Sequence, residues 1–159
     1  MTISARLDTF LSTHDIAYQA IPHGHSNSSV GSAVAAHVPL NQIAKAVMLI
    51  DHQGRKMMAV LPANNKINFS ILNDELYGSY QLLKEHDVYH MFSDCEHGAI
   101  PPIGEAYNIA AVCDKQLDYL ENVYIEAGDH ETLLKLDRDS FREMMSNSKH
   151  ISFSREVIH

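Results

Sequence analysis

The stretch that decides the fold is Ala46-Val47-Met48-Leu49-Ile50, then Asp51-His52-Gln53-Gly54-Arg55, then, after Lys56, Met57-Met58-Ala59-Val60-Leu61. The two outer segments are almost continuous in apolar residues, and the middle segment has the polar, glycine-containing composition of a turn. This pattern predicts the two strands of a hairpin. Because neither strand alternates between apolar and polar residues, both faces of the hairpin are expected to be buried.

Weaker patterns on both sides of the hairpin predict further helices and strands. Apolar residues at i, i+4, i+7 and i+8 predict a helix from Ile3 to Leu11. Further helices are expected from Ser28 or Ser29 to His37, from Asn68 or Ser70 to a stop at Gly78, over 84–92, and from Asp137 or Asp139 onward. Strands are expected at 16–21, 80–83, 109–113, 123–127 and 133–136. Several strands follow one another through hairpin-length connections, so the chain is predicted to be α+β, with helices around a mixed sheet.

The length and composition are those of one globular domain over residues 1–159. The chain is 45% apolar and 20% charged, close to globular averages. Lys and Arg total 12 against 20 Asp and Glu, which gives a formal net charge of −8. Nonspecific binding to long nucleic acid needs clustered Lys and Arg, so DNA is not an expected partner. Recognition of a short, chemically distinctive end is compatible with this charge.

Location in the cytoplasm is expected from three features of the sequence. Cys95 and Cys113 are too few for the disulfide scaffold of a secreted protein. The N-terminal residues lack the basic region and apolar run of a signal peptide. The longest apolar run, Ala46 to Ile50, is far shorter than the ~20 residues of a membrane span, so no membrane association is expected.

Two segments carry residues suited to chemistry. Lys45 directly precedes the apolar run, where a partly desolvated ammonium acts as a strong local cation. The second segment is Asp94-Cys95-Glu96-His97-Gly98-Ala99-Ile100-Pro101-Pro102-Ile103-Gly104. Its prolines stiffen the backbone and its glycines permit close approach of a ligand, which suits a binding wall built from main chain. The alternatives are a solvated lysine at a strand end and a rigid connector between helix and strand.

Taken together, Lys45, the Gly98-Ala99-Ile100-Pro101-Pro102 loop and the Glu126-Ala127-Gly128 strand end resemble the YbaK/EbsC family. This family is related to the editing domain inserted in bacterial prolyl-tRNA synthetases. The resemblance extends from about Phe10 to Met145. It implies a mixed, barrel-like sheet surrounded by helices, and an aminoacyl-tRNA deacylase that hydrolyses the ester of a mischarged tRNA.

The resemblance also implies roles for particular residues. The family's essential lysine corresponds to Lys45, and its Gly-x-x-x-Pro loop to Gly98 and Pro102. Backbone N–H groups around Gly98 and Ala99 are expected to face the ester carbonyl, and a ribose hydroxyl of the substrate to help activate water. The remaining expected substrate-binding residues are Ile100, Pro101, Gly104, Gly128, His23 and His130.

The expected partners are the aminoacyl-tRNA acceptor end and a synthetase or other carrier that binds the tRNA body. Family members commonly remove Ala, Cys or similarly small residues from tRNA for proline. No cofactor and no metal are expected. The matching residues leave the amino acid and the tRNA species open.

Other readings of the same residues remain open. His23 and His25, or the helical pair His86 and His90, resemble metal ligands, which would make the protein a metal-dependent hydrolase. The helical pair lacks the Glu that a zincin has directly after its first His. Cys95 and Cys113 suggest a thiol nucleophile, although no partner base is evident. A further alternative is a non-catalytic module that keeps the pocket and binds an aminoacyl or nucleotide-like ligand for regulation.

Overall fold

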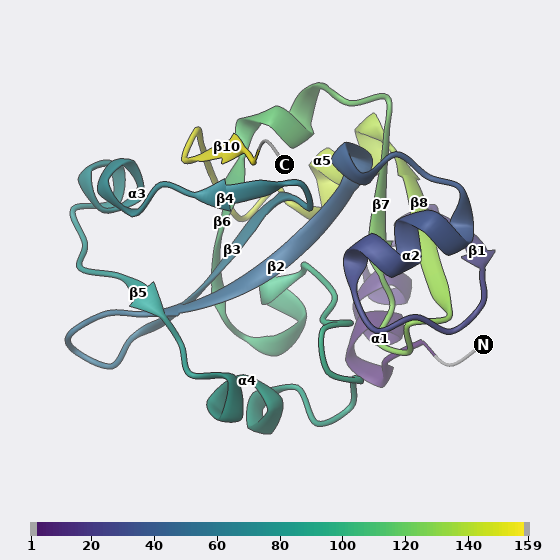
Figure 1. Ribbon diagram of the computed structural model, residues 1–159, viewed down its shortest axis with the longest axis horizontal. Helices are drawn as coiled ribbons and strands as arrows, with labels where there is room; N and C mark the ends of the chain where they lie inside the picture. The colour runs from purple at the N-terminus through teal and green to yellow at the C-terminus, as the bar shows by residue number, and fades with distance from the viewer. Residues whose placement is uncertain (1–2, 158–159) are drawn as a thin grey trace.

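The structure is a computed structural model that describes residues 3–157, shown in Figure 1. Within these residues the α-helices are α1 (Ala5–Thr13), α2 (Ser29–Ala36), α3 (Phe69–Leu76), α4 (Glu85–Met91) and α5 (Arg138–Met144). The strands are β1 (Gln19–Pro22), β2 (Ile43–Ile50), β3 (Lys56–Pro62), β4 (Asn65–Ile67), β5 (Gln81–Leu82), β6 (Ala110–Asp114), β7 (Asn122–Glu126), β8 (Thr132–Asp137), β9 (Lys149–Ile151) and β10 (Ser154–Glu156). Short 3₁₀ turns occupy Leu40–Gln42, Gly104–Tyr107 and Lys115–Tyr119.

Eight strands form one mixed sheet in the order β1-β8-β7-β2-β3-β6-β9, with β5 added beside β2. The pairs β2–β7, β3–β6 and β6–β9 are parallel, whereas the other pairs are antiparallel. The α+β class and the mixed sheet are therefore confirmed. The mixed sheet is not closed, with β1 and β9 at its two ends.

The hairpin of β2 and β3 lies at the centre of the sheet, as the sequence predicts. Its register pairs Ile50 with Lys56 next to the turn and Ala44 with Pro62 at the far end. In the turn, the buried Asp51 carboxylate accepts hydrogen bonds from the backbone N–H groups of Gln53 and Arg55. The strand starts earlier than expected, so Lys45 lies inside β2 rather than before it.

Both faces of the hairpin are buried, because helices cover the sheet on both sides. Even-numbered β2 residues such as Met48 pack with α1, α4 and α5 in the larger core cluster. Odd-numbered residues pack on the opposite face, where Leu49 joins Leu72 of α3 and Ile43 joins Ala33 of α2. In Figure 1, α2 lies in front of β7 and β8 and α1 behind them. Lys45 is odd-numbered and so belongs to the face that α2 and α3 cover.

Several element boundaries differ from the expectations. Helix α3 ends at Leu76; the next residue, Tyr77, takes the left-handed conformation (φ 52°), and Gly78 donates its N–H to the Asn73 carbonyl. The sequence predicts Gly78 as the residue that ends this helix. A Cβ at Gly78 would lie 2.8 Å from the Tyr80 ring, so packing explains why a glycine stands here. Strand β1 begins at Gln19 rather than residue 16 and includes Pro22 at the edge of the sheet. Strands β4, β9 and β10 were not predicted.

One feature of the sheet creates the candidate site. Along the edge that faces away from β3, strand β2 pairs with two shorter strands, β7 and β5. Its ladder with β7 involves Ile43 and Ala44, and its ladder with β5 involves Leu49 and Ile50. Between the two ladders, no strand from residues 3–157 lies beside the edge of β2. The Met48 carbonyl in this gap accepts a hydrogen bond from Leu83. The loop after α4 approaches the sheet at this gap.

Candidate active site at the gap beside strand β2

A cavity of about 380 Å³ lies at the gap in the sheet. This volume falls within the range of small-molecule sites. Its walls come from four segments that are distant in sequence: β2, the residue before the α2 cap, the β5–α4 region, and the loop after α4. The lining residues are Asn27, Ala46, Val47, Met48, Leu82, Leu83, Glu85, Val88, Tyr89, His97, Gly98 and Ile100.

The loop wall is held in place from three sides. The Glu96 N–H donates to the Gly128 carbonyl at 2.7 Å, which fixes the loop to the end of β7. The His97 ring stacks on Tyr89 of α4, with ring centroids 3.4 Å apart. The His97 carbonyl accepts a hydrogen bond from Nε2 of His130, at 2.6 Å. The loop is therefore rigid at the point where it lines the cavity.

Gly98 has the backbone conformation that glycine adopts readily, with φ +81°, and it is exposed. The preceding peptide is trans, so its C=O and N–H point in opposite directions. Because the His97 carbonyl points to His130, the Gly98 N–H points away from it. Among residues 3–157, no group accepts a hydrogen bond from the Gly98 N–H. The Ala99 N–H, by contrast, donates to the Glu96 carbonyl at 3.1 Å and is therefore already engaged in this structure.

The rest of the loop divides into lining and supporting residues. Ile100 lines the cavity, whereas Ala99, Pro101, Pro102 and Gly104 are buried. A Cβ on Gly104 would lie 2.5 Å from the Ile109 carbonyl oxygen, so this glycine is required by the close approach of two chain segments. These buried residues support the wall formed by His97, Gly98 and Ile100.

Lys45 is half-buried beside two residues of β2, Ala46 and Val47, that line the cavity. Burial lowers the pKa of its ammonium from the ordinary value, and the nearby charge of Lys66 lowers this pKa further. Within residues 3–157 the ammonium has no hydrogen bond or ion pair. A partly desolvated cation without an internal partner is suited to bind an anionic group of a ligand.

The corner between β7 and β8 contains a buried pair of ionisable residues. Glu126, the last residue of β7, and His130 are each 2% exposed. His130 Nδ1 lies 3.8 Å from Glu126 Oε1, and within residues 3–157 neither that nitrogen nor either carboxylate oxygen has a hydrogen-bond partner. Burial raises the pKa of Glu126 to about 7; Asp129 adds to the shift, whereas the Ser32 hydroxyl opposes it.

His23 and Gly128 lie close to this corner. The His23 N–H donates to the Glu131 carbonyl, and its ring Nδ1 bonds to the Gly24 carbonyl. Gly128 (φ +108°) is buried, and a Cβ there would lie 3.2 Å from Ser4 and 3.4 Å from Cys95 Sγ. Neither residue lines the cavity, so both are placed to support the corner.

The thiols do not have the environment of nucleophiles. Burial raises the pKa of Cys95 to about 11, and its Sγ lies 3.3 Å from the Tyr107 hydroxyl. Burial also raises the pKa of Cys113, which is fully buried in the core. A reactive cysteine needs the opposite shift, toward the thiolate.

Among residues 3–157, one group of side chains has the spacing of metal ligands: Cys113, Asp118 and His150. Both ring nitrogens of His150 are engaged, Nδ1 with Asp118 and Nε2 with the Met145 carbonyl, each at 2.8 Å. His23, His25, His86 and His90, which the sequence offered as ligands, do not belong to this group. None of its three members lines the cavity beside β2.

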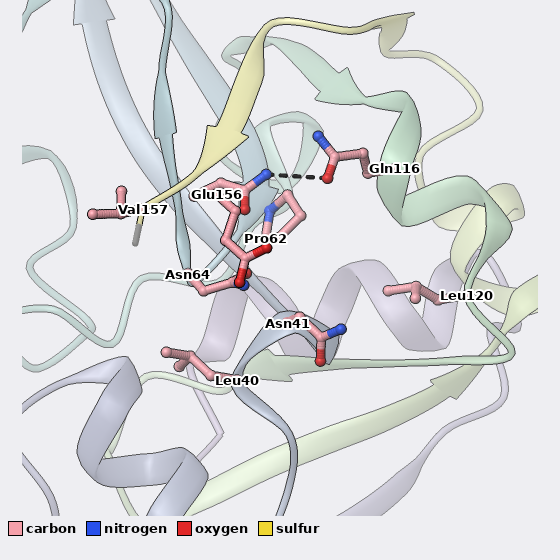
Figure 2. A pocket seen from close by; sticks show the side chains of 9 residues that line it. Leu40, Asn41, Pro62, Asn64, Gln116, Leu120, Glu156 and Val157 are labelled. Carbon is pink, nitrogen blue, oxygen red and sulfur yellow. Dashed lines mark hydrogen bonds between the residues drawn. The ribbon is translucent and has the colours of Figure 1, made fainter. Parts of the chain in front are cut away.

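A second cavity, of about 650 Å³, is lined by neither Lys45 nor the Gly98 loop. Figure 2 shows it between the 3₁₀ turn at Leu40 and the strand end at Glu156 and Val157. Its walls are rich in amides. Two of these are engaged: Asn65 donates to Gln116 (dashed in Figure 2) and to Ser154, and Gln116 donates to the Ser154 carbonyl. The Asn64 Oδ1 has no hydrogen-bond partner among residues 3–157. We assign the candidate site to the smaller cavity, because Gly98 and the strand of Lys45 meet there.

Three features of the site were not found from the sequence. Asn27 lines the cavity, Tyr89 packs under the loop, and Glu126 faces His130. Glu126 belongs to a segment that the sequence had singled out, but its burial depends on α2 covering that face. Within residues 3–157, no helix has the length and apolar character to cross a bilayer.

The family model described as "Aminoacyl-tRNA editing domain" matches residues 23–144. No curated protein matches. A hypothetical protein, APE2540, superposes with a TM-score of 0.83 at 18% identity, covering 94% of this chain and 99% of the other.

Two further solved structures show the same fold. One, described as a candidate trans-editing enzyme for prolyl tRNA synthetase, has a TM-score of 0.80 at 15% identity and covers 97% of both chains. The other, a candidate signal transduction protein from Marinobacter aquaeolei VT8, has a TM-score of 0.77 at 16% identity; the match covers 95% of this chain and 30% of that one. Since the family model spans most of the sequence and includes Lys45, the Gly98 loop and His130, the chain belongs to the aminoacyl-tRNA editing domain family.

Proposed function

We propose that the protein is a trans-editing aminoacyl-tRNA deacylase that hydrolyses the ester of a small amino acid mischarged on tRNA for proline. The observation that carries the proposal is the Gly98 N–H, which is unpartnered among residues 3–157 and oriented by the bond from His130 to the same peptide. Membership of the editing family supports the ester as substrate. The solved structure described as a candidate trans-editing enzyme for prolyl tRNA synthetase supports the choice of tRNA.

The proposed chemistry is addition of water to the ester carbonyl, followed by loss of the ribose hydroxyl as leaving group. The Gly98 N–H donates to the oxyanion that develops on the carbonyl oxygen, and one such donor is typically worth roughly 10²–10³ in rate. The Lys45 ammonium binds the phosphate of the terminal nucleotide or orients the ester. A ribose hydroxyl of the substrate helps to activate the water. No thiol takes part, because both cysteines are held protonated.

The substrate-binding roles follow from position. His97, Gly98 and Ile100 contact the aminoacyl ester, whereas Ala99, Pro101, Pro102 and Gly104 hold that wall from behind. His23, Gly128 and His130 support the corner that anchors the loop. The net charge of −8 fits an enzyme that grips only the acceptor end and leaves the tRNA body to a synthetase or another carrier.

A non-catalytic module with the same cavity is the second candidate, and the likeness to part of a larger candidate signal transduction protein favours it. A panel of tRNAs, each charged with a correct or a wrong amino acid, separates the two. We expect the purified protein to release alanine or another small residue from tRNA for proline and to leave prolyl-tRNA intact. Binding of the charged tRNA without release from any member of the panel would support the module and contradict the deacylase.

A further inference from the structure

The buried pair formed by Glu126 and His130 is joined to the proposed catalytic N–H by a continuous chain of contacts. Glu126 Oε1 faces His130 Nδ1 at 3.8 Å. On the other side of the ring, His130 Nε2 bonds to the His97 carbonyl at 2.6 Å. That carbonyl and the Gly98 N–H belong to one peptide group. Any change in the position of the imidazole therefore moves the donor that faces the ester.

The tautomer of His130 follows from its partners. A carbonyl oxygen only accepts hydrogen bonds, so Nε2 carries the hydrogen. Nδ1 is then a bare lone pair in the neutral ring and an N–H in the charged ring. A bare Nδ1 opposite an ionised Glu126 would place two lone pairs face to face in a buried site. One proton held by the pair, on the carboxyl or on Nδ1, would avoid this and would allow a hydrogen bond once the two atoms approach from the 3.8 Å of the structure.

The backbone at this corner is built to hold the ring in place. His130 has φ +56°, a left-handed conformation that is uncommon outside glycine. Its carbonyl accepts a hydrogen bond from the Ser26 N–H, and a Cβ on Gly98 would lie 3.3 Å from its Nε2. An approach of about 1 Å would bring Nδ1 and Oε1 within hydrogen-bond distance. The corner thus holds the ring against the loop, with Glu126 as the group that faces its other nitrogen.

Four charged or titratable groups surround the pair. Asp129, on the same corner, raises the pKa of Glu126 beyond the effect of burial. His25 lies edge-on to His130, with ring centroids 6.3 Å apart, and bonds to Glu96 of the loop at 2.9 Å. Lys45 of β2 lies on the same face of the sheet as Glu126 of β7. Ile43 pairs with Tyr124, and Lys45 and Glu126 are each two residues further along their strands. Within residues 3–157 no ion pair joins Lys45 to Glu126.

We propose that Glu126 is a positioning residue: by sharing one proton with His130 it holds the ring against the His97 carbonyl and so orients the Gly98 N–H toward the substrate. A hydrogen bond to a peptide carbonyl also polarises the N–H of the same peptide and strengthens it as a donor. The inference rests on the proposed deacylase function and adds a pH dependence to it. When the shared proton leaves at high pH, the buried Glu126 carboxylate faces the lone pair of His130 Nδ1. The imidazole is then no longer held against the His97 carbonyl.

Two substitutions of Glu126 test the proposal. In Glu126→Gln, the amide donates to Nδ1 at every pH, so we expect kcat within about threefold of wild type at pH 6. In Glu126→Ala, no group faces Nδ1, so we expect kcat to fall about tenfold or more with KM little changed. Glu131→Gln is the matched control, because Glu131 is an exposed carboxylate on the same corner. It should behave as wild type.

The pH profile separates positioning from a purely structural role. Because the raised pKa of Glu126 is about 7, the ratio of the wild-type rate to the Gln-variant rate should fall between pH 6 and pH 8.5. Taking the ratio removes the intrinsic increase of ester hydrolysis with pH. A constant ratio, or wild-type kcat in a folded Glu126→Ala protein, would overturn the proposal.

A spectroscopic measurement keeps this test independent of the proposed function. The Gly98 amide resonance should titrate with a midpoint near pH 7 in the wild type and show no such titration in Glu126→Gln. A titrating amide in a protein that releases no amino acid would leave the coupling intact and contradict only the deacylase. A deacylase whose Gly98 amide does not titrate would contradict the coupling alone.

Discussion

At the scale of single residues, Lys45 is the cation whose surroundings best fit a ligand role. It is half-buried, its pKa is lowered by that burial, and it has no internal partner among residues 3–157. We expect Lys45→Ala to lower the single-turnover deacylation rate by about 10²-fold or more, the scale for a preorganised electrostatic group. Stability should change little or rise, since the substitution removes a partly desolvated, unpaired charge.

Two further variants make the Lys45 prediction specific. Lys45→Arg should rescue poorly, because the planar guanidinium does not place a compact charge at the same point. Lys56→Ala is the matched control, since Lys56 is exposed at the opposite end of the same hairpin. It should keep the wild-type rate. A folded Lys45→Ala protein with the wild-type rate would remove Lys45 from the mechanism.

Gly98 allows a test with an internal control for backbone strain. Gly98→Val places a β-branched residue at φ +81° and a Cβ 3.3 Å from His130 Nε2, so we expect deacylation to be abolished. Gly54 has nearly the same conformation, φ +79°, in the hairpin turn, and a Cβ added there would have no atom within 4 Å. Gly54→Val should carry a similar strain of roughly 1–3 kcal/mol and keep its activity.

Thermal melts and deacylation rates of the two valine variants, measured together, give the result. A similar loss of stability in both, with loss of activity in Gly98→Val alone, is the expected outcome. Equal activity in the two folded variants would show that the loop is a connector and that the site lies elsewhere.

At the scale of elements, the parts predicted from sequence are those determined by local chemistry. The central hairpin follows from two apolar runs around a polar turn, and α2 and α5 begin where Ser28 and Asp137 cap them. Strands β4, β9 and β10 have three residues each, too few for an alternation pattern, and they form only because distant segments pair with them.

The same distinction applies to the site. The motif residues at Lys45 and Gly98 could be identified from sequence. That Lys45 lies inside β2, however, depends on how far the pairing with β3 extends, because Lys45 pairs with Leu61 and Ala44 with Pro62. The engagement of the Ala99 N–H with Glu96 depends on how the loop folds. The contact of Glu126 with His130 depends on the corner between β7 and β8. None of these contacts has a signature in residue types alone.

Asp114 shows how a single side chain fixes an element that sequence did not predict. This fully buried residue ends β6, and its Oδ2 accepts hydrogen bonds from the Phe153 N–H and from the N–H and hydroxyl of Ser154. These bonds hold the turn between β9 and β10. Asp114→Ala leaves the buried donors without an acceptor, so we expect the free energy of unfolding to fall by about 2–4 kcal/mol.

Chemical denaturation of the Asp114→Ala variant beside Asp74→Ala measures this effect. Asp74 is an exposed residue of α3 and should change the free energy of unfolding by less than about 0.5 kcal/mol. A loss in Asp114→Ala no larger than in the control would mean that the turn is held by other contacts.

At the scale of the whole molecule, charge limits how the protein can bind its substrate. With 12 Lys and Arg against 20 Asp and Glu, the surface offers few cations for the phosphates of a folded tRNA. Phosphate contacts dominate nonspecific affinity, so the binding energy of a protein with this balance has to come from a short part of the RNA. The cavity beside β2 has room for a small ligand and meets that requirement.

The resulting prediction concerns how much of the tRNA the protein needs. A mischarged acceptor-stem hairpin, without the anticodon arm, should be deacylated with a kcat/KM within about tenfold of the full tRNA, because the missing arms make few contacts. The dependence of kcat/KM on salt should also be shallow, since each neutralised phosphate steepens it. Both substrates are compared at 50 and 200 mM salt with the same mischarged amino acid. A loss of more than about 10³-fold on truncation, together with a steep salt dependence, would show that this acidic protein contacts the tRNA body directly and needs no carrier to bring it.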